Sequence, residues 1–403
     1  MLIERLKVSG LLSFSPQGID LPLGNLNVLI GPNGSGKSNF LEVLALLKAA
    51  PTNLSMPVKA MGGIREWLWK NGSAGQEATV EVLVNAPDDP RPLQNSLTIA
   101  EHGGRFEVVD ERIQRILDLD DRTNLRAEDL EQKGVFYAFS RGRPVIFDVE
   151  GGVLVDTDNR LRRLRREDLK PEESILSQRR DPERYPALAW LQDKYEQIHL
   201  YRNWAFGPGA ALRREQSTHG RADFLADGGE NLPLVLSHFT SDVKSELLLS
   251  LRMLYDGIED YRMAIMGGAV LLYVREQGGR EVPATRLSDG TLRFLGLLTI
   301  LLHPAPPPLI AIEEPELGLH PDVIPHIARL LMRASQRTQL VVTTHSRMLV
   351  DALSGDPSSV IVCEKADGAS QFERLDPDDL ALWLEKYSLG DLWSMGELGG
   401  NRW

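Results

Sequence analysis

Hydrophobic residues in the first 150 positions alternate with polar ones or gather in short runs that are rich in β-branched and aromatic side chains. A period of two is typical of β-strands with one buried face, and turn-forming sequences such as His102-Gly103-Gly104 separate the runs. A charged run over 113–130 is predicted to be helical. An antiparallel layer is predicted from strands over 4–11, 19–23, 77–84, 96–99, 106–109, 135–139 and 145–149.

The hydrophobic period changes to about 3.6 residues between positions 186 and 255, which predicts a helical lobe. No heptad pattern continues over the many turns that a long coiled coil needs. The apolar stripes consist of Leu188, Leu191, Tyr195 and Ile198, and of Leu247, Leu251 and Leu254.

Strand-like runs return after residue 258, first over 265–274 and later over 309–312, 339–344 and 360–365. A helix is predicted over 291–302, and the proline-rich segment that follows it ends that helix. The expected organisation is a first lobe over 1–180, a helical insertion over 181–257 and a second lobe over 258–403.

The chain has 403 residues, of which 42% are hydrophobic and 25% charged, enough to bury a large core. No apolar run approaches the roughly 20 residues needed to cross a bilayer, so no membrane association is expected. The first residues show no basic region followed by an apolar core, which predicts no secretory signal and a cytoplasmic location. The one cysteine, Cys363, excludes an internal disulfide and is predicted to lie in a buried strand.

The net charge of −12 does not favour a surface that is positive throughout, although it leaves room for a local basic groove. Residues 159–166 read Asn-Arg-Leu-Arg-Arg-Leu-Arg-Arg. Their basic side chains could contact phosphates, or they could form a solvated helix face that is offset by Glu167 and Asp168. The sequence leaves both interpretations open.

A complete phosphate-binding loop joins the apolar run 26–30 to the amphipathic run 39–48. Glycines let the backbone wrap a phosphate chain, a lysine reaches the β- and γ-phosphates, and a hydroxyl binds magnesium. The positive end of the helix dipole adds to this anion site. The nucleotide-binding residues are Gly31, Pro32, Asn33, Gly34, Ser35, Gly36, Lys37 and Ser38.

Three more nucleotide-site sequences follow in a fixed order, at 287–291, 309–315 and 343–346. Together with the loop they resemble the ABC-ATPase superfamily, and the resemblance covers both ends of the chain. The stretch Glu-Glu-Pro-Glu-Leu-Gly-Leu-His-Pro at 313–321 is similar to RecF, SMC and OLD-type ATPases rather than to transporter subunits. This resemblance implies an α/β ABC-ATPase head with mixed parallel and antiparallel sheets and a helical lobe, and it implies ATP and Mg²⁺ as cofactors.

The resemblance also implies the roles of single residues. Lys37 neutralises the β- and γ-phosphates, and Ser38 binds magnesium together with Glu313, which stands where the family usually has Asp. The sequence leaves direct and water-bridged coordination by Glu313 both open. Glu314 is expected to polarise the attacking water, and His345 is expected to sense the γ-phosphate. His320 has an equally simple interpretation as a turn residue.

The signature sequence of this chain, Ser288-Asp289-Gly290, departs from the common Leu-Ser-Gly-Gly-Gln at Asp289. In the resembling families the serine and the glycine amide bind the γ-phosphate of ATP held by a second subunit. Each chain then carries two half sites, which implies an ATP-dependent homodimer. Gln178 is the predicted loop glutamine that couples magnesium to the lobes; Gln76 and an ordinary surface amide are the alternatives.

Two classes of function are weighed. The first is a RecF/SMC/OLD-like switch in DNA repair or anti-phage defence that works with a separate nuclease or toxin and with DNA as a candidate ligand. The alternative is the ATPase subunit of a membrane transporter, which places its signature roughly a hundred residues after the phosphate loop. Here Ser288 lies 250 residues after Ser38. Only 58 residues follow His345, too few for a nuclease domain of the TOPRIM type.

The C-terminal region contains Trp383, Tyr387, Trp393 and Trp403. They could dock a partner, or they could pack onto the core of this chain.

Overall fold

A computed structural model describes residues 1–70, 77–86, 91–116, 134–140, 143–147, 161–202, 204–207 and 209–399. The chain forms two compact units, and neither is continuous in sequence. The first comprises Met1–Gly24, Gly31–Ile198 and Val362–Arg374, and the second comprises Asn25–Ile30, His199–Ile361 and Leu375–Trp403. The three-part division at 180 and 257 stays a prediction.

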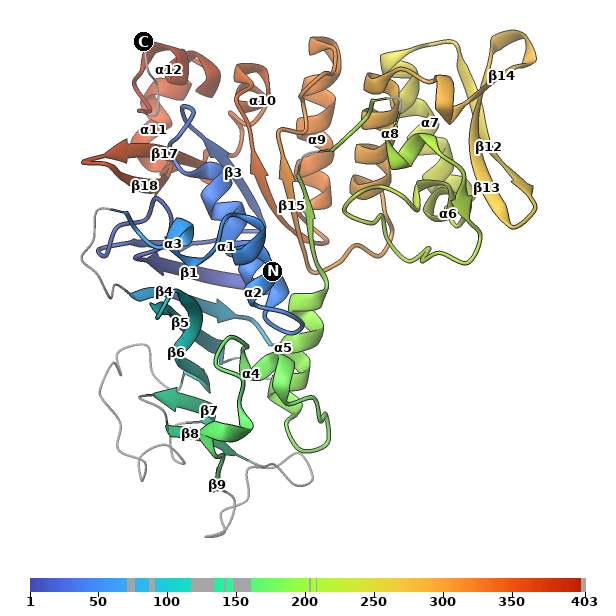
Figure 1. The fold of residues 1–403 in the computed structure, drawn as a ribbon. Coiled ribbons are helices and arrows are strands. Elements are labelled where there is room, and N and C mark those ends of the chain that lie inside the picture. Colours follow the sequence, from blue (N-terminus) through green and yellow to red (C-terminus); the bar gives the residue numbers. More distant parts are fainter. Residues whose placement is uncertain are drawn as a thin grey trace. The chain divides into compact units, whose positions relative to one another are not determined.

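The first unit contains an eight-stranded sheet in the order β2-β1-β4-β5-β6-β7-β8-β9, drawn in blue to green in Figure 1. Every neighbouring pair in it is antiparallel. The predicted antiparallel layer is therefore confirmed. Its strands are β1 (Ile3–Ser9), β2 (Ile19–Pro22), β4 (Glu77–Val84), β5 (Leu93–His102), β6 (Arg105–Arg115), β7 (Val135–Ser140), β8 (Arg143–Phe147) and β9 (Leu161–Arg163).

The helix predicted over 113–130 is wrong at its described start, and the helix face that was one interpretation of 159–166 is absent from the described part of that segment. Ile113 is a fully buried residue of β6 that pairs with Asn95 and Tyr137, so strand pairing prevails over the charged pattern that suggested a helix. Residues 117–130 lie outside the described residues. Leu161–Arg163 form β9 and Arg166–Asp168 form a 3₁₀ turn, so the described part of the basic segment is not an α-helix; residues 159 and 160 lie outside the described residues.

The helices of the first unit include α1, which begins at the phosphate-binding loop, and α4, which ends at Gln178. Pro186 opens α5, as expected for a residue that cannot donate a backbone hydrogen bond. Cys363 is buried in β17, as predicted, and burial raises the pKa of its thiol well above the ordinary value. The elements are α1 (Lys37–Ala49), α2 (Ser55–Ala60), α3 (Ile64–Trp67), α4 (Ile175–Gln178), α5 (Pro186–Glu196), β17 (Val360–Ala366), which begins in the second unit, and β18 (Ala369–Arg374).

The second unit holds strands in the order β10-β15-β16-β3. The pairs β15–β16 and β16–β3 are parallel, and every residue of β3 and β16 is buried. Because parallel strands point the same way, their carboxyl ends lie at one edge of the sheet. The strands are β10 (Ile198–Tyr201), β15 (Leu309–Glu313), β16 (Gln339–Thr343) and β3 (Leu26–Ile30), and the helices that follow in this part of the chain are α8 (Asp289–Leu301), α9 (Ile324–Ala334) and α10 (Arg347–Asp351).

A smaller antiparallel sheet in the second unit contains a long hairpin, seen in yellow in Figure 1. The run predicted as one strand over 265–274 is divided by the turn at Gly267 and Gly268. The predicted helical region contains α6 and α7 but also short strands. The elements are β11 (Gln216–Ser217), α6 (Leu232–Ser237), α7 (Ser241–Leu254), β12 (Ile258–Met266), β13 (Ala269–Glu276) and β14 (Arg280–Pro283).

The C-terminal aromatic residues fall into two groups. Trp393, in α12 (Leu389–Met395), is 8% exposed, so it packs onto the chain's own core. Trp383, in α11 (Pro377–Leu384), and Tyr387 are 45% and 38% exposed, so the core-packing interpretation does not extend to them. Trp403 lies outside the described residues. None of the helices in the described part of the chain combines the length and apolar character needed to span a bilayer.

A buried carboxyl group joins the large sheet to the segment that carries Gln178. Glu111 of β6 accepts hydrogen bonds from the Ser174 hydroxyl and, at 2.8 Å, from the backbone N–H of Ile175 at the start of α4. Burial raises the pKa of Glu111 to about 7, and the two hydrogen bonds partly oppose that rise.

Stability should therefore depend on pH through Glu111. The folded-state pKa lies above the unfolded value of 4.5, so the stability that the bound proton contributes is lost as pH rises from 4.5 through about 7. We expect Glu111→Gln, which mimics the protonated carboxyl, to lose less stability than the wild type over that range, by roughly 3 kcal/mol at most. Thermal melting between about pH 5 and pH 8 measures the difference.

The matched control is Glu107→Gln, on the same strand with a partly exposed side chain. It should leave the pH dependence of melting unchanged. Parallel melting curves for the wild type and Glu111→Gln across the whole range would contradict the assignment.

Candidate functional site

The loop Gly31–Ser38 follows β3 directly and passes into α1, as the sequence pattern predicts. The buried Lys37 ammonium donates hydrogen bonds to the carbonyl oxygens of Gly31 and Pro32, at 2.8 and 3.0 Å. The loop thus curls around its own lysine, and phosphate oxygens are strong acceptors that could exchange with these carbonyls.

Two glycines of the loop are required by close packing. Gly31 has φ +144°, and a Cβ there would lie 2.1 Å from the carbonyl oxygen of Cys363. Gly36 has φ +105°, and its Cβ would lie 2.2 Å from the Ser370 hydroxyl. Any larger residue would force the loop away from the β17–β18 hairpin, which explains why the pattern needs glycine here.

The residues of the loop fit a nucleotide phosphate chain. Ser35 is 1% exposed, and its hydroxyl has no hydrogen-bond partner among the described residues. No described side chain caps the N-terminus of α1, which leaves that end suited to an anion. Ser38 is exposed on the first turn of this helix. Asn33 and Gly34 are exposed as well.

The donor set also fits magnesium, which prefers oxygen ligands and usually takes only one or two carboxylates from the protein. No cluster of three or more His, Cys, Asp or Glu capable of holding a metal is present in the described ranges. In the second unit, Glu313 at the end of β15 carries the carboxylate predicted to bind the metal. Its Oε2 lies 3.3 Å from Nε of Arg202, and both side chains are about four-fifths buried.

The structure brings Glu314 and His345 together. Glu314 has φ +46°, a left-handed conformation that costs of the order of 1–3 kcal/mol for a residue other than glycine. Its backbone N–H donates to the carbonyl oxygen of Thr343 at 3.0 Å, and its Oε1 lies 3.7 Å from Nε2 of His345. The catalytic roles of both residues stay predictions.

Glu316 is a further site residue that the sequence analysis did not single out. Its Oε1 accepts hydrogen bonds from the Thr344 hydroxyl at 2.5 Å and from the backbone N–H of His345 at 3.1 Å. Its Oε2 is buried without a hydrogen-bond partner among the described residues. Burial raises the pKa of Glu316, and these hydrogen bonds oppose the rise. The sequence feature that could have identified Glu316 is that it is the third glutamate in the stretch 313–321 and had no assigned role.

The signature turn caps α8 and borders an open cleft. The Ser288 hydroxyl accepts a hydrogen bond from the backbone N–H of Thr291 at 3.0 Å. Asp289 forms an ion pair with Arg213, and a Cβ at Gly290 would lie 3.2 Å from the carbonyl oxygen of Gly318. The cleft has a volume of about 620 Å³ and is lined by Ser288, Gly290, Thr291, Gly318, His320 and Tyr255 among others. His320 also accepts a hydrogen bond from the backbone N–H of Asp322, in keeping with a turn role.

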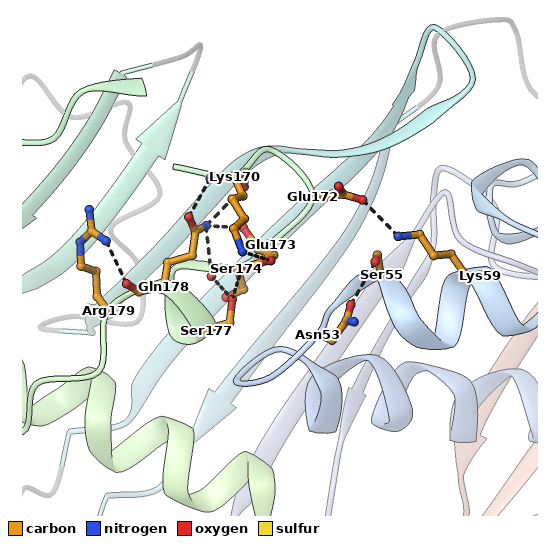
Figure 2. Close-up of polar contacts among 10 residues, drawn as sticks. All are labelled: Asn53, Ser55, Lys59, Lys170, Glu172, Glu173, Ser174, Ser177, Gln178 and Arg179. Atoms are coloured by element: carbon orange, nitrogen blue, oxygen red, sulfur yellow. Dashed lines mark hydrogen bonds and ion pairs between the residues drawn. The ribbon is translucent and has the colours of Figure 1, made fainter. Parts of the chain in front are cut away.

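The side-chain amide of Gln178 forms hydrogen bonds with the backbone of the preceding loop, residues 170–174 (Figure 2). Its Oε1 accepts from the backbone N–H of Lys170 at 2.7 Å, and its Nε2 donates to the carbonyl oxygen of Glu173 at 2.9 Å. An ion pair of 3.2 Å joins Glu172 in the same loop to Lys59 at the end of α2. These contacts brace the loop, while coupling of Gln178 to magnesium stays a prediction. Gln76 lies outside the described residues.

The fold and the order of these motifs define a P-loop NTPase of the ABC-ATPase class, in which the phosphate loop and the acidic strand end come from one parallel sheet. Residues 26–351 match the family described as "AAA domain, putative AbiEii toxin, Type IV TA system", and the chain belongs to this family. No curated protein matches the chain.

Solved structures of SMC heads share the fold. The SMC head bound to the C-winged helix domain of ScpA has a TM-score of 0.58 at 15% identity, with 94% of this chain and 99% of that chain covered. The Pyrococcus furiosus head, solved with an extended coiled coil and the C-terminal domain of ScpA, has a TM-score of 0.54 at 14% identity, with 95% and 98% covered. The Pyrococcus yayanosii head has a TM-score of 0.51 at 14% identity, with 95% and 99% covered. The predicted fold class is confirmed.

Substitution of Gly36 tests the phosphate loop. We expect Gly36→Ala to weaken binding of a fluorescent ATP analogue by roughly tenfold or more, because the added methyl group and the positive φ together force a shift that costs about 1–3 kcal/mol. Equilibrium fluorescence titration measures the affinity.

Gly355→Ala is the matched control, since a Cβ there meets nothing within 4 Å and the backbone is not in the left-handed region. Equal affinity in both variants would show that the loop does not hold the nucleotide.

Proposed function

We propose that the protein is an ATPase that dimerises on binding ATP and acts as a switch for a separate effector protein. The observation that carries the proposal is the pairing of Glu314 with His345 at the end of a buried parallel sheet. A carboxylate on a strained backbone with its oxygen 3.7 Å from an imidazole nitrogen suits activation of a water molecule.

In the proposed reaction Lys37 neutralises the β- and γ-phosphates, and the loop amides orient the phosphate chain. Ser38 and Glu313 would hold Mg²⁺, which would stabilise the charge that develops on the phosphate oxygens. The Glu313 carboxylate that would bind the metal is paired with Arg202 in this structure. Glu314 accepts a proton from the water whose oxygen attacks the γ-phosphorus, while the bond to ADP breaks and inorganic phosphate leaves. His345 donates a hydrogen bond to the γ-phosphate.

The second half of the proposal is a composite site made by two copies of the chain. The signature turn at Ser288–Gly290 lines an open cleft with hydroxyl groups and the N-terminus of α8, which suits a phosphate supplied by another molecule.

The proposed effector role includes anti-phage defence, and the family description supports this by naming a toxin and a Type IV toxin–antitoxin system. SMC heads solved with domains of ScpA support a separate protein partner for this chain as well. A role in DNA repair, with DNA as a ligand, is the second form of the proposed switch. Steady-state ATP hydrolysis with and without linear duplex DNA distinguishes direct gating by DNA from gating by a protein partner.

Glu314→Gln should reduce ATP turnover by roughly a hundredfold or more, since a general base contributes on the order of 10²–10⁴. It should leave ATP binding intact and therefore accumulate as an ATP-bound dimer. Phosphate release measures turnover, and light scattering coupled to gel filtration measures mass.

The Lys37→Ala variant is the control, because it removes nucleotide binding and should stay monomeric with ATP. A Glu314→Gln protein that is monomeric at saturating ATP would contradict dimerisation, and one with wild-type turnover would contradict the catalytic role.

A further inference from the structure

Arg213 is a buried arginine whose guanidinium group donates several hydrogen bonds. It ends a 3₁₀ turn (Ala211–Arg213), and its side chain is only 8% exposed. Its Nε donates to the carbonyl oxygen of Phe206 at 2.6 Å, and its Nη1 donates to the carbonyl oxygens of Leu287 at 2.6 Å and Ala284 at 3.2 Å. A buried guanidinium must satisfy its five N–H groups, and here the backbone supplies most of the acceptors.

The carbonyl oxygen of Thr285 is a further backbone acceptor of Arg213 at 3.4 Å, and the side-chain acceptor of Arg213 among the described residues is the carboxylate of Asp289, whose side chain is 66% exposed. This pair gives a physical reason for the aspartate in the signature sequence. Leu287 and Asp289 are the two neighbours of Ser288, so a single guanidinium binds the backbone carbonyl group before the predicted phosphate-binding serine and the side-chain carboxylate after it.

A second arginine, Arg293, contacts the same segment as Arg213. The guanidinium of Arg293, on α8, lies 5.2 Å from the ring centroid of Phe206, the residue whose carbonyl group Arg213 binds. Arg293 also donates to the carbonyl oxygen of Leu317, in the loop that follows the acidic strand end. Burial lowers the pKa of Arg293, and the nearby Glu316 and Glu314 oppose that effect. Within the second unit, Arg293 thus connects α8, which begins at the signature turn, to the loop that carries Glu314.

We propose that Arg213 is a positioning residue that orients Ser288 and the Gly290 amide toward a nucleotide bound by a second copy of the chain. The inference rests on the proposed composite site. Arg213 acts through the turn and touches no reacting atom itself. Its loss should therefore impair the signature half site and leave the phosphate-loop half site of the same chain intact.

Arg213→Ala should lower kcat for ATP hydrolysis by roughly tenfold or more, as expected for a displaced transition-state donor. Binding of a fluorescent ATP analogue to the variant should stay within about twofold of wild type, because that binding depends on Lys37 and its loop. Arg213→Lys should be intermediate, since an ammonium cannot reproduce the planar fork. Arg214→Ala, at the exposed neighbouring arginine, is the charge-matched control and should keep wild-type turnover.

Mixing variants separates positioning from general destabilisation. In a heterodimer of Arg213→Ala with Lys37→Ala, one site combines the intact phosphate loop of the first chain with the intact signature of the second. The mixture should hydrolyse ATP at least about threefold faster than the average of the two variants measured separately at the same total protein concentration. Lys37→Ala mixed with Glu314→Gln should show no such gain, because both defects lie on the nucleotide-binding side.

Asp289→Asn provides a second route if Arg213→Ala does not fold, because Asp289 is exposed and its replacement is isosteric. It should lose turnover and be rescued by Lys37→Ala in the same way. Absence of rescue for folded variants, with an active wild type, would overturn the positioning role. A wild type that neither hydrolyses ATP nor dimerises would instead overturn the proposed function.

Discussion

Parallel pairing of β15, β16 and β3 is the constraint on which the candidate site depends. The register places Glu313 opposite Thr343, and the backbone N–H of Thr344 continues the ladder by donating to the carbonyl oxygen of Leu29 at 3.1 Å. The acidic residues, the histidine segment and the entry to the phosphate loop therefore leave the sheet at a common edge. A shift of one residue in β16 would separate His345 from Glu314 and exchange the side chains that pack on the two buried faces of the strand.

The residues of the candidate site include three that have energetically unfavourable backbone conformations or unpaired buried polar atoms. Glu314 takes a left-handed backbone conformation, Glu316 buries an oxygen without a partner, and Ser35 buries an unpaired hydroxyl in the phosphate loop. In an ordinary protein core, replacing any one of these residues to remove the strain or the unpaired oxygen would stabilise the protein. Their combination at strand ends and in one loop agrees with a site built to receive charged ligands.

The elements that could be predicted from sequence are those with local signals. Alternating hydrophobic residues located β1, β2, β4 and most of the large sheet, and the glycine spacing located the phosphate loop. Arg202 and Arg213 could not be found in this way, because their partners Glu313 and Asp289 lie 111 and 76 positions away. A helix was predicted over 113–130, and a helix face was one interpretation of 159–166. Pairing of β6 and β9 with neighbouring strands instead makes strands of residues 113–115 and 161–163.

The ion pair between Arg202 and Glu313 has a consequence for how the chain folds. Glu313, Glu314 and Glu316 lie within four residues, and such a group of carboxylates would repel one another if no cation were near. Arg202 offsets one of these charges from within the polypeptide itself. Arg202 therefore supplies, from within the polypeptide, part of the positive charge that this cluster of carboxylates needs when the chain folds, unlike a structural zinc site whose chain unfolds when a chelator removes the ion.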